Sequence, residues 1–309
     1  MLSHTVRILN FDNSLLNQPR FLERFDPAIV DCTHIGPSCR LWTSERDAAR
    51  IRAVLAPEFR HSITLTGSGD FHHVTSLLLE QFTEPLSVIV FDNHPDWDIL
   101  PPRRGCGSWV SAVLRQQLIE KMVLIGIASN DLHGPALHCG NLQALSGNRV
   151  EVYPWEQRVS RVFFRHVPVN GSMQTRKWGP LTTIVWQNLK QKDPEEFAFS
   201  LAKRLSGKRV YISIDKDCLL PAHALTNWEA GSIGLDVLLR MLRIFKEHLV
   251  VAGVDITGEY SPPVFTSTFK RCCARFDHPR RWTAENCDEA VIAQVNEQTN
   301  LCIVECLLC

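Results

Sequence analysis

Short runs of apolar residues recur along the chain and alternate with stretches of helical character. The runs lie at 6–11, 62–66, 86–91, 122–127, 150–153, 210–214 and 249–254. Their hydrophobicity is continuous rather than alternating, which is typical of strands that are covered on both faces in a parallel sheet. We therefore expect a layered α/β domain, whose ligand sites lie beyond the carboxyl ends of the strands.

The segments between these runs carry helix signals. Ser44 is a candidate N-cap for a helix that runs to Leu55, and Asp193 precedes a proline and two glutamates, as at the start of a helix. Apolar residues at helical spacing predict another helix over 235–245. The basic segment 156–189 departs from this rhythm, and we interpret it as a surface excursion. A loop over 261–283 leads to a final helix from about residue 284. No internal repeat divides the chain, so we expect residues 1–309 to form one domain.

Composition narrows the class of protein. With 309 residues, 45% of them hydrophobic, the chain can bury a substantial core. Its 33 basic residues balance 33 acidic residues, which gives no electrostatic reason to expect a nucleic-acid or membrane partner. It has no apolar run of about eighteen residues and no leader-like amino terminus. The eleven scattered cysteines fit reduced thiols better than a disulfide framework. We expect a soluble cytoplasmic protein that acts on a small molecule.

One segment, residues 92–96 (DNHPD), combines two carboxylates and an imidazole directly after the apolar run at 86–91. Side chains alternate in an extended segment, so Asp92, His94 and Asp96 share one face. Three such ligands on one face can bind a divalent metal ion. An isolated motif of this kind is more often a solvated acidic turn, so the metal interpretation depends on the rest of the chain.

Two further runs end in residues with metal-ligand chemistry. Asp215 and Asp217 follow the run at 210–214, and a glycine-rich turn after 62–66 delivers His72 and His73. If the two carboxylate pairs meet in one pocket, their four negative charges repel one another unless cations are present. Two divalent ions balance four carboxylates, whereas one ion leaves two charges uncompensated. We therefore expect a dinuclear centre, with Mn²⁺ as the first choice for oxygen and nitrogen ligands and Fe²⁺ or Zn²⁺ as alternatives.

The three motifs resemble those of a known enzyme family. Residues 69–73 (GDFHH) resemble a GGDHS motif, residues 92–96 a DAHxD motif, and residues 213–217 (SIDKD) an SxDxD motif. These are the metal motifs of the ureohydrolases, which include arginase, agmatinase and formimidoylglutamase. The motifs occur in family order over roughly residues 60 to 262. The resemblance implies a three-layer α/β/α sandwich around a mainly parallel sheet of roughly eight strands, as in the arginase/deacetylase fold, and a homo-oligomer.

The resemblance also implies roles for individual residues. The expected residue types fill all six metal-ligand positions: His72, Asp92, His94, Asp96, Asp215 and Asp217. Asp92 and Asp215 would bridge the two ions, and Asp96 would also orient the attacking water. Glu259, in a segment that resembles the family's DxxE…P, would bind a cationic, guanidinium-like group. His73 stands where the family usually has serine, and a structural histidine is favoured there over a ligand.

Outside the ligand positions the match weakens. Leu220 occupies the place of the last aspartate in SxDxDxxDP, and Cys106 stands near the position of the family's proton-shuttling histidine. Two neighbouring arginines and a predicted helix start would lower the pKa of this thiol, which is a proton shuttle, a nucleophile or an apolar spacer. Cys106, His73 and His223 are all candidates for returning a proton to the leaving amine. The candidates for substrate recognition would suit a ligand with anionic and apolar parts: Arg103, Arg104, Asn227, Trp228 and Glu229.

Three functions are compatible with these motifs. The first is a dinuclear metal-dependent hydrolase that cleaves a non-peptide C–N bond, amidino or guanidino, in a small polar substrate. The second is a deacetylase-like hydrolase that acts on an acylated amine, for which the pair His72-His73 resembles a tandem histidine base. The third is a metal-stabilised binding protein without turnover, because the substrate-recognition loops differ from those of the family while the ligands do not.

Overall fold

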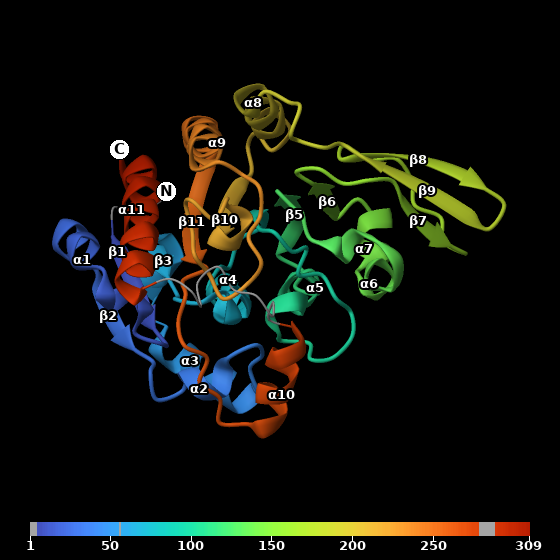
Figure 1. The fold of residues 1–309 in the computed structure, drawn as a ribbon. Coiled ribbons are helices and arrows are strands. Elements are labelled where there is room, and N and C mark those ends of the chain that lie inside the picture. Colours follow the sequence, from blue (N-terminus) through green and yellow to red (C-terminus); the bar gives the residue numbers. More distant parts are fainter. Residues whose placement is uncertain (1–4, 56, 278–287) are drawn as a thin grey trace.

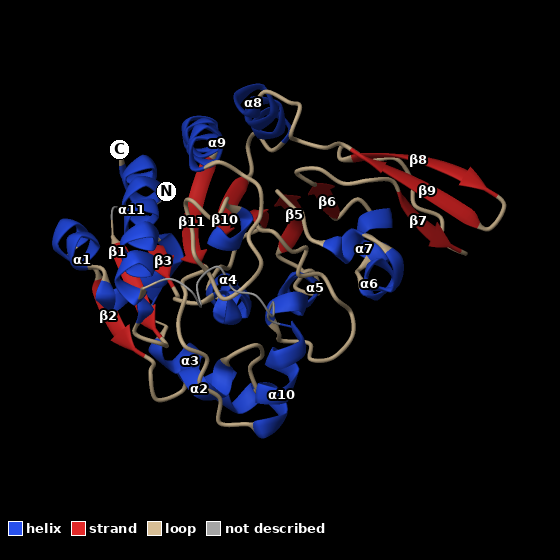
Figure 2. Ribbon diagram, in the orientation of Figure 1, coloured by secondary structure: helices blue, strands red, loops and turns tan. Residues whose placement is uncertain are grey.

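A parallel sheet forms the centre of the protein (Figure 1, Figure 2). The structure is a computed structural model, and it describes residues 5–55, 57–277 and 288–309. Eight strands lie in the order β2-β1-β3-β11-β10-β4-β5-β6, and all neighbours are parallel. They are β1 (Val6–Asn10), β2 (Ala28–Asp31), β3 (Ile63–Leu65), β4 (Leu86–Phe91), β5 (Ile119–Ile125), β6 (Val150–Tyr153), β10 (Arg209–Asp215) and β11 (Val250–Thr257).

Helices cover both faces of the sheet. One face packs against α1 (Pro19–Phe25), α8 (Pro194–Arg204), α9 (Leu235–His248) and α11 (Glu289–Leu308). The other packs against α3 (Glu45–Val54), α4 (Thr75–Leu79), α5 (Trp109–Val113), α6 (Gly134–Cys139) and α7 (Leu142–Ser146). The remaining helices are α2 (Gly36–Cys39) and α10 (Thr268–Asp277). Helix α10 lies within 261–283, so the expectation of a loop over that whole segment is wrong. The layered α/β domain expected from the continuous apolar runs is confirmed, and so is the three-layer α/β/α sandwich with roughly eight strands that the family resemblance implies.

Short 3₁₀ turns connect several of these elements. They are η1 (Ser14–Asn17), η2 (Pro57–His61), η3 (Gly69–Val74), η4 (Cys106–Ser108), η5 (Asn130–Leu132) and η6 (Lys216–Cys218). Three of them, η3, η4 and η6, carry residues that the sequence marks as candidates for the functional site. No helix among the described residues is both long enough and apolar enough to cross a bilayer.

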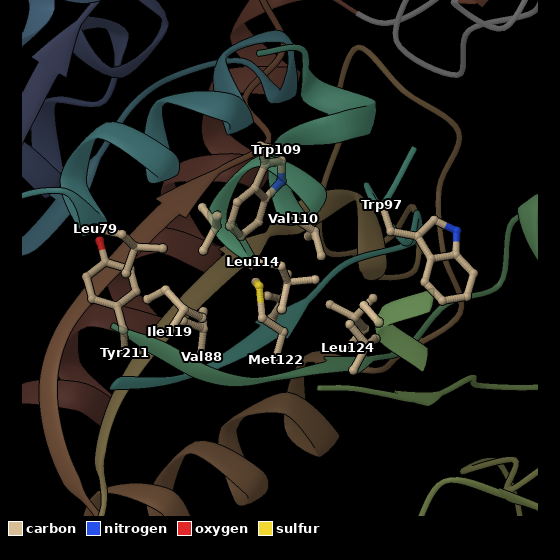
Figure 3. Close-up of a cluster of buried hydrophobic side chains, with 14 of the residues drawn as sticks. Leu79, Val88, Trp97, Trp109, Val110, Leu114, Ile119, Met122, Leu124 and Tyr211 are labelled. Carbon is tan, nitrogen blue, oxygen red and sulfur yellow. The ribbon is translucent and has the colours of Figure 1, made fainter. Parts of the chain in front are cut away.

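The core has two parts because the sheet has two covered faces. On one face, Val88 of β4, Met122 of β5 and Tyr211 of β10 pack under Trp109 and Val110 of α5 (Figure 3). All five side chains are at most 1% exposed. Burying one large apolar side chain stabilises the fold by about 2 kcal/mol. The packing fixes the ends of β4 and β10, and these ends carry the aspartates.

The helix signals in the sequence have the expected effects. The Ser44 hydroxyl accepts a hydrogen bond from the Asp47 amide at the start of α3, and Asp193 accepts one from the Glu196 amide at the start of α8. The final helix begins at Glu289 with Asp288 as its N-cap, and residues 284–287 lie outside the described residues.

Two parts of the fold have no strong signal in the sequence. Strand β2 is short, largely exposed and at the edge of the sheet, so it lacks the continuous apolar run of a buried strand. The segment treated as a surface excursion contains β7 (Ser160–Phe163), β8 (Met173–Trp178) and β9 (Leu181–Trp186), which form an antiparallel sheet in the order β7-β9-β8. This sheet extends away from the central one, at the right of Figure 1.

The carboxyl ends of the central strands bring the three motifs together. In the register of β10 with β4, Ile214 pairs with Phe91, so Asp215 and Asp92 follow at adjacent positions. Strand β11 lies between β10 and β3, and β3 leads into η3, which carries both histidines. The sheet order therefore places three sequence-distant segments at one edge.

Candidate metal centre

Two groups of potential ligands meet at this edge and share one aspartate. The first contains His72, Asp92 and Asp96, and the second contains Asp92, His94 and Asp217. In each group one ligand atom per residue lies within 4.8 Å of the others. A shared carboxylate between two groups is the arrangement that a pair of neighbouring ions requires.

The spacing of the first group suits a metal ion. His72 Nδ1 lies 3.1 Å from Asp92 Oδ2, 3.1 Å from Asp96 Oδ2 and 3.5 Å from Asp215 Oδ2. Ligand atoms about 2.1 Å from an ion and at right angles to one another are about 3 Å apart. His72 Nδ1 and Asp92 Oδ2 are buried and have no hydrogen-bond partner in the described structure. Because unpaired buried polar atoms are costly, these two atoms are suited to coordinating a cation.

The second group has similar spacing. His94 Nδ1 lies 2.9 Å from Asp217 Oδ2 and 3.7 Å from Asp92 Oδ1. The Asp217 amide donates to Asp215 Oδ1 at 3.0 Å, which holds the two aspartates in one orientation. Nitrogen and oxygen donors without thiolate favour Mn²⁺, Fe²⁺ or Zn²⁺ over softer ions. The donor set therefore fits a pair of divalent ions.

Each histidine is held through its other ring nitrogen. His72 Nε2 lies 2.9 Å from the Ser213 hydroxyl, which donates to Asp255 Oδ2 at 2.9 Å. Thr75 donates to the same carboxylate oxygen. This chain of contacts fixes the ring of His72 with Nδ1 toward the carboxylates, as partners of metal-bound histidines commonly do.

His94 is fixed in a comparable way. Its Nε2 lies 3.4 Å from Glu229 Oε1, and its ring meets the edge of Trp228 at a centroid distance of 5.6 Å. Trp228 donates from Nε1 to Asp70 at 3.2 Å. Both histidines therefore present Nδ1 to the carboxylates and Nε2 to a polar partner.

The carboxylates of the site disfavour one another's ionised forms. Burial and the charge of Asp217 raise the pKa of Asp215 well above its usual range. Burial and the charge of Asp92 raise the pKa values of Asp96 and Asp217. Burial opposes the charge on His94, but the charge of Asp217 raises the pKa of this imidazole well above its usual value. The site has an excess of negative charge that bound cations would compensate.

The backbone around Asp96 is unusual. Asp96 has a φ of 47°, a left-handed conformation that costs an aspartate about 1 kcal/mol. The Val110 amide donates to its carbonyl at 3.0 Å, and Trp109 Nε1 donates to its Oδ2 at 2.8 Å. Because two contacts from α5 hold this residue, its carboxylate points at His72 rather than into solvent.

Glycine is required where β11 ends. Gly258 has a φ of 91°, and a Cβ there would lie 2.5 Å from Asp215 Oδ1 and 2.6 Å from the Lys216 amide nitrogen. Only glycine permits this close approach without displacing an aspartate of the site. The sequence motif contains this residue, but its steric role follows only from the fold.

A cavity of about 770 Å³ opens over the two ligand groups. Three further carboxylates line its wall, those of Asp98, Asp131 and Glu229. Aromatic side chains, including Trp42 and Phe269, line another part. None of the described residues that line it is a lysine or an arginine. The described wall of the cavity therefore combines carboxylates with aromatic side chains.

The basic residues expected near the substrate lie elsewhere. Arg104 forms ion pairs with Glu45 at 3.0 Å and with Glu80 at 3.8 Å, and Arg103 is exposed. Neither lines the cavity. Cys106 does line it. The guanidinium of Arg104 is thus engaged by two surface carboxylates.

The other candidates divide between the cavity and the surrounding protein. Trp228 and Glu229 line the cavity, whereas Asn227 is buried and joins two loops through hydrogen bonds to Ser68 and Ser261. His223 does not line the cavity. Asn227 therefore holds the loop that carries Trp228 and Glu229.

His73 faces away from the ligand groups. Its Nε2 forms a short hydrogen bond with the Thr43 hydroxyl, and burial lowers the pKa of the imidazole to about 3, with a contribution from Lys270. His73 is absent from both ligand groups and from the cavity wall. This placement matches the structural histidine that the sequence favours.

Glu259 lies behind the ligand groups in a buried polar network. Its Oε1 accepts from Lys216 Nζ and from Asn300 Nδ2 at 2.7 Å, and its Oε2 accepts from Gln18 Nε2 at 3.0 Å. Lys216 also donates to Asn300 Oδ1 at 2.9 Å. Glu259 is only 2% exposed and does not line the cavity.

Several residues of the site were not identified from the sequence. Asp255 interrupts the apolar run of β11, and its register partner on β10 is Ser213, a pairing that only the sheet order reveals. Trp109 and Asp131 come from segments without motifs. A charged residue inside a buried strand is the one signal that could have indicated Asp255.

The sequence comparisons find one partial match. No family model matches the sequence. The chain is 26% identical over 206 residues to an uncharacterised protein of Thermotoga maritima, covering 66% of this chain and 60% of the relative. The chain thus matches less than two thirds of the length of that curated relative.

Solved structures share the architecture over most of the chain. Arginase from Bacillus subtilis superposes with a TM-score of 0.57 at 14% identity, covering 98% of this chain and 97% of that one. Arginase from Bacillus caldovelox gives 0.56 at 13% identity, with 98% and 97% covered. Proclavaminate amidino hydrolase from Streptomyces clavuligerus gives 0.54 at 15% identity, with 93% and 77% covered. The chain therefore has the fold of the ureohydrolases.

Proposed function

We propose that this protein is a metal-dependent hydrolase that cleaves a non-peptide C–N bond, amidino or guanidino, in a small polar substrate. The observation that carries the proposal is the pair of ligand groups that share Asp92 beneath an acidic cavity. The structural neighbours include arginases and an amidino hydrolase by name. We further propose that the protein is a cytoplasmic homo-oligomer without a nucleic-acid or membrane partner.

Six residues would hold two divalent ions, most simply Mn²⁺: His72, Asp92, His94, Asp96, Asp215 and Asp217. When bound, such ions lower the pKa of a water molecule toward neutrality and polarise the bond under attack. The chain itself contributes the orientation of the ligands. Ser213 and Glu229 fix the two imidazole rings, and Trp109 fixes the Asp96 carboxylate.

The residues of the cavity supply the other functions that hydrolysis needs. Asp96, held by Trp109, accepts a hydrogen bond from the attacking water and thereby orients it. Trp228 and the apolar wall exclude bulk water from the reacting carbon. Of the three groups considered for returning a proton to the leaving amine, Cys106 lines the cavity, whereas His73 and His223 do not.

The position of His73 argues against the deacetylase-like alternative. A tandem histidine base needs both imidazoles near the substrate, but His73 forms a hydrogen bond with Thr43 and does not line the cavity. The second carboxylate of the SIDKD motif, Asp217, also has a direct role in the proposed two-ion arrangement. We therefore favour the amidino or guanidino substrate over an acylated amine.

A substrate panel tests the function. Protein loaded with Mn²⁺ is incubated with guanidino, amidino and N-acetyl compounds, and release of urea, ammonia and acetate is measured. We expect urea or ammonia from a guanidino or amidino compound, and none from an Asp92→Asn variant. Acetate as the main product would support the deacetylase alternative. No product from any compound, with both metal positions filled, would support a non-catalytic binding protein.

A further inference from the structure

The structure separates two glutamates that could recognise a cationic substrate. Glu259 follows β11 in the segment that resembles the family's substrate-binding motif, whereas Glu229 lies in the loop after η6. Their surroundings differ in exposure and in partners. Glu259 is 2% exposed, and the side chain of Glu229 is 52% exposed.

Both carboxylate oxygens of Glu259 accept hydrogen bonds from buried donors, and Glu259 does not line the cavity. One carboxylate oxygen accepts from Lys216 and Asn300, and the other accepts from Gln18. Lys216 is fully buried, stands in the chain between two metal-ligand aspartates and needs a counter-charge. If Glu259 turned toward a substrate, a buried ammonium would lose its anion, which is strongly unfavourable.

Glu229, in contrast to Glu259, faces the cavity. It lines the cavity, and its Oε1 is 3.4 Å from His94 Nε2. Its side chain is half exposed, so a ligand in the cavity can reach the carboxylate. Because its neighbour His94 belongs to the second ligand group, Glu229 lies beside that group on the cavity wall.

The wall of the cavity carries acidic side chains in addition to those of the ligand groups. Apart from the carboxylates of the ligand groups, the acidic residues of the wall are Asp98, Asp131 and Glu229, and Glu229 is the one in contact with a ligand residue. No lysine or arginine among the described lining residues competes for it.

We propose that Glu229 binds the cationic amidino or guanidino group of the substrate, and that Glu259 is the buried counter-ion of Lys216. This assignment rests on the proposed function and identifies its specificity-determining residue. The carboxylate for the cation then comes from the loop after β10 instead of the loop after β11. Trp228, the residue before Glu229, contributes an aromatic wall against which a planar amidinium can stack.

A binding experiment tests this assignment without requiring turnover. The probe is agmatine, titrated calorimetrically into the full chain loaded with Mn²⁺, with wild type, Glu229→Gln, Glu259→Gln and Glu305→Gln compared. Glu305 lies on the outer face of α11 and serves as the control. At saturating Mn²⁺, we expect Glu229→Gln to weaken the agmatine Kd about tenfold or more, as for loss of a charged hydrogen bond. Glu259→Gln and Glu305→Gln should change the Kd of folded, metal-loaded protein by less than about twofold.

A second readout separates direct binding from an effect through His94. If Glu229 only positioned the imidazole, Glu229→Gln would lower Mn²⁺ affinity, and the agmatine Kd would return to its wild-type value at saturating Mn²⁺. That result, or a larger effect of Glu259→Gln, would overturn the assignment. Absence of agmatine binding to wild type would also overturn it. Binding with the expected variant pattern but without hydrolysis would leave the assignment in place and remove the proposed function.

Discussion

The buried ion pair between Lys216 and Glu259 makes a quantitative prediction about stability. Lys216 is 0% and Glu259 2% exposed, and the pair lies beneath the ligand groups. Removing one partner of a buried pair leaves an uncompensated charge and typically costs about 3 to 5 kcal/mol. We therefore expect Lys216→Met and Glu259→Gln each to lower the free energy of unfolding by that amount.

The double variant should lose much less than the sum of the two single losses. Lys216→Met with Glu259→Gln removes both charges, and the introduced amide still offers an acceptor oxygen for Asn300 or Gln18. The coupling energy in the double-mutant cycle should then be about 3 kcal/mol. Coupling of this size is typical of residues in direct contact or in one hydrogen-bond network, and Lys216 and Glu259 meet both conditions.

The assay is thermal unfolding of metal-free protein, because ligand binding would otherwise add to the apparent stability. At about 2.1 cal/mol/K per residue, 309 residues give an unfolding entropy of about 0.65 kcal/mol/K. A loss of 3 to 5 kcal/mol then lowers the Tm by about 5 to 8 °C in a single cooperative transition. Glu305→Gln, in an exposed pair with Arg24 at 3.4 Å, should change it by less than about 2 °C.

A different outcome would refute the buried-pair interpretation. If Glu259→Gln lowered the Tm no more than Glu305→Gln does, Glu259 would not be the counter-ion of a buried lysine. Additive losses in the double variant would lead to the same conclusion. A free carboxylate facing the cavity would then be the better description of Glu259.

Three further predictions concern residues around the metal centre. Ser213→Ala removes the partner of the His72 imidazole and should weaken Mn²⁺ binding by roughly 10- to 100-fold in a calorimetric titration. The control is Ser87→Ala, because Ser87 is buried and its hydroxyl lacks a hydrogen-bond partner among the described residues. Equal weakening by both variants would contradict the role of Ser213. Gly258→Ala forces a Cβ against an aspartate of the site and should reduce the Mn²⁺ content of purified protein, whereas full content by elemental analysis would show that the close approach is not required. Burial raises the pKa of Asp255 from 3.8 to about 6, so the folded protein binds this proton more tightly than the unfolded chain does. The protonated carboxyl therefore adds about 3 kcal/mol to the free energy of unfolding below pH 4, and this stabilisation is lost as the pH rises to about 6. In urea unfolding, Asp255→Asn should flatten the pH dependence over that range, and an unchanged slope would argue against the buried carboxyl as its source.

The sequence predicts the fold well where burial controls it. The seven apolar runs correspond to strands of the central sheet because continuous hydrophobicity is needed when both faces are covered. Ser44 and Asp193 mark helix starts because their side chains accept backbone amide hydrogen bonds. Strand β2 and the β7-β9-β8 sheet are exposed or antiparallel, so they lack that signal.

The site is predictable in part for a related reason. His72 and the aspartates around it are recognisable because each motif directly follows a buried strand, and parallel strands end at the same edge. The sequence contains no comparable signal for the direction in which a side chain points. Glu259 and Glu229 are both candidates for substrate binding in the sequence, but only the position of Lys216 reveals which carboxylate is neutralised. Likewise, His73 is adjacent to a ligand residue yet contacts Thr43.

The two groups that share Asp92 should bind two divalent ions, and the metal content of each chain measures that number. Protein purified without chelators and equilibrated with Mn²⁺ is analysed for metal content and protein concentration, for wild type and Asp92→Asn. The shared carboxylate predicts about two ions per wild-type chain and fewer than one per Asp92→Asn chain. A firm value of one ion per wild-type chain, or an unchanged value in Asp92→Asn, would contradict the two-ion site.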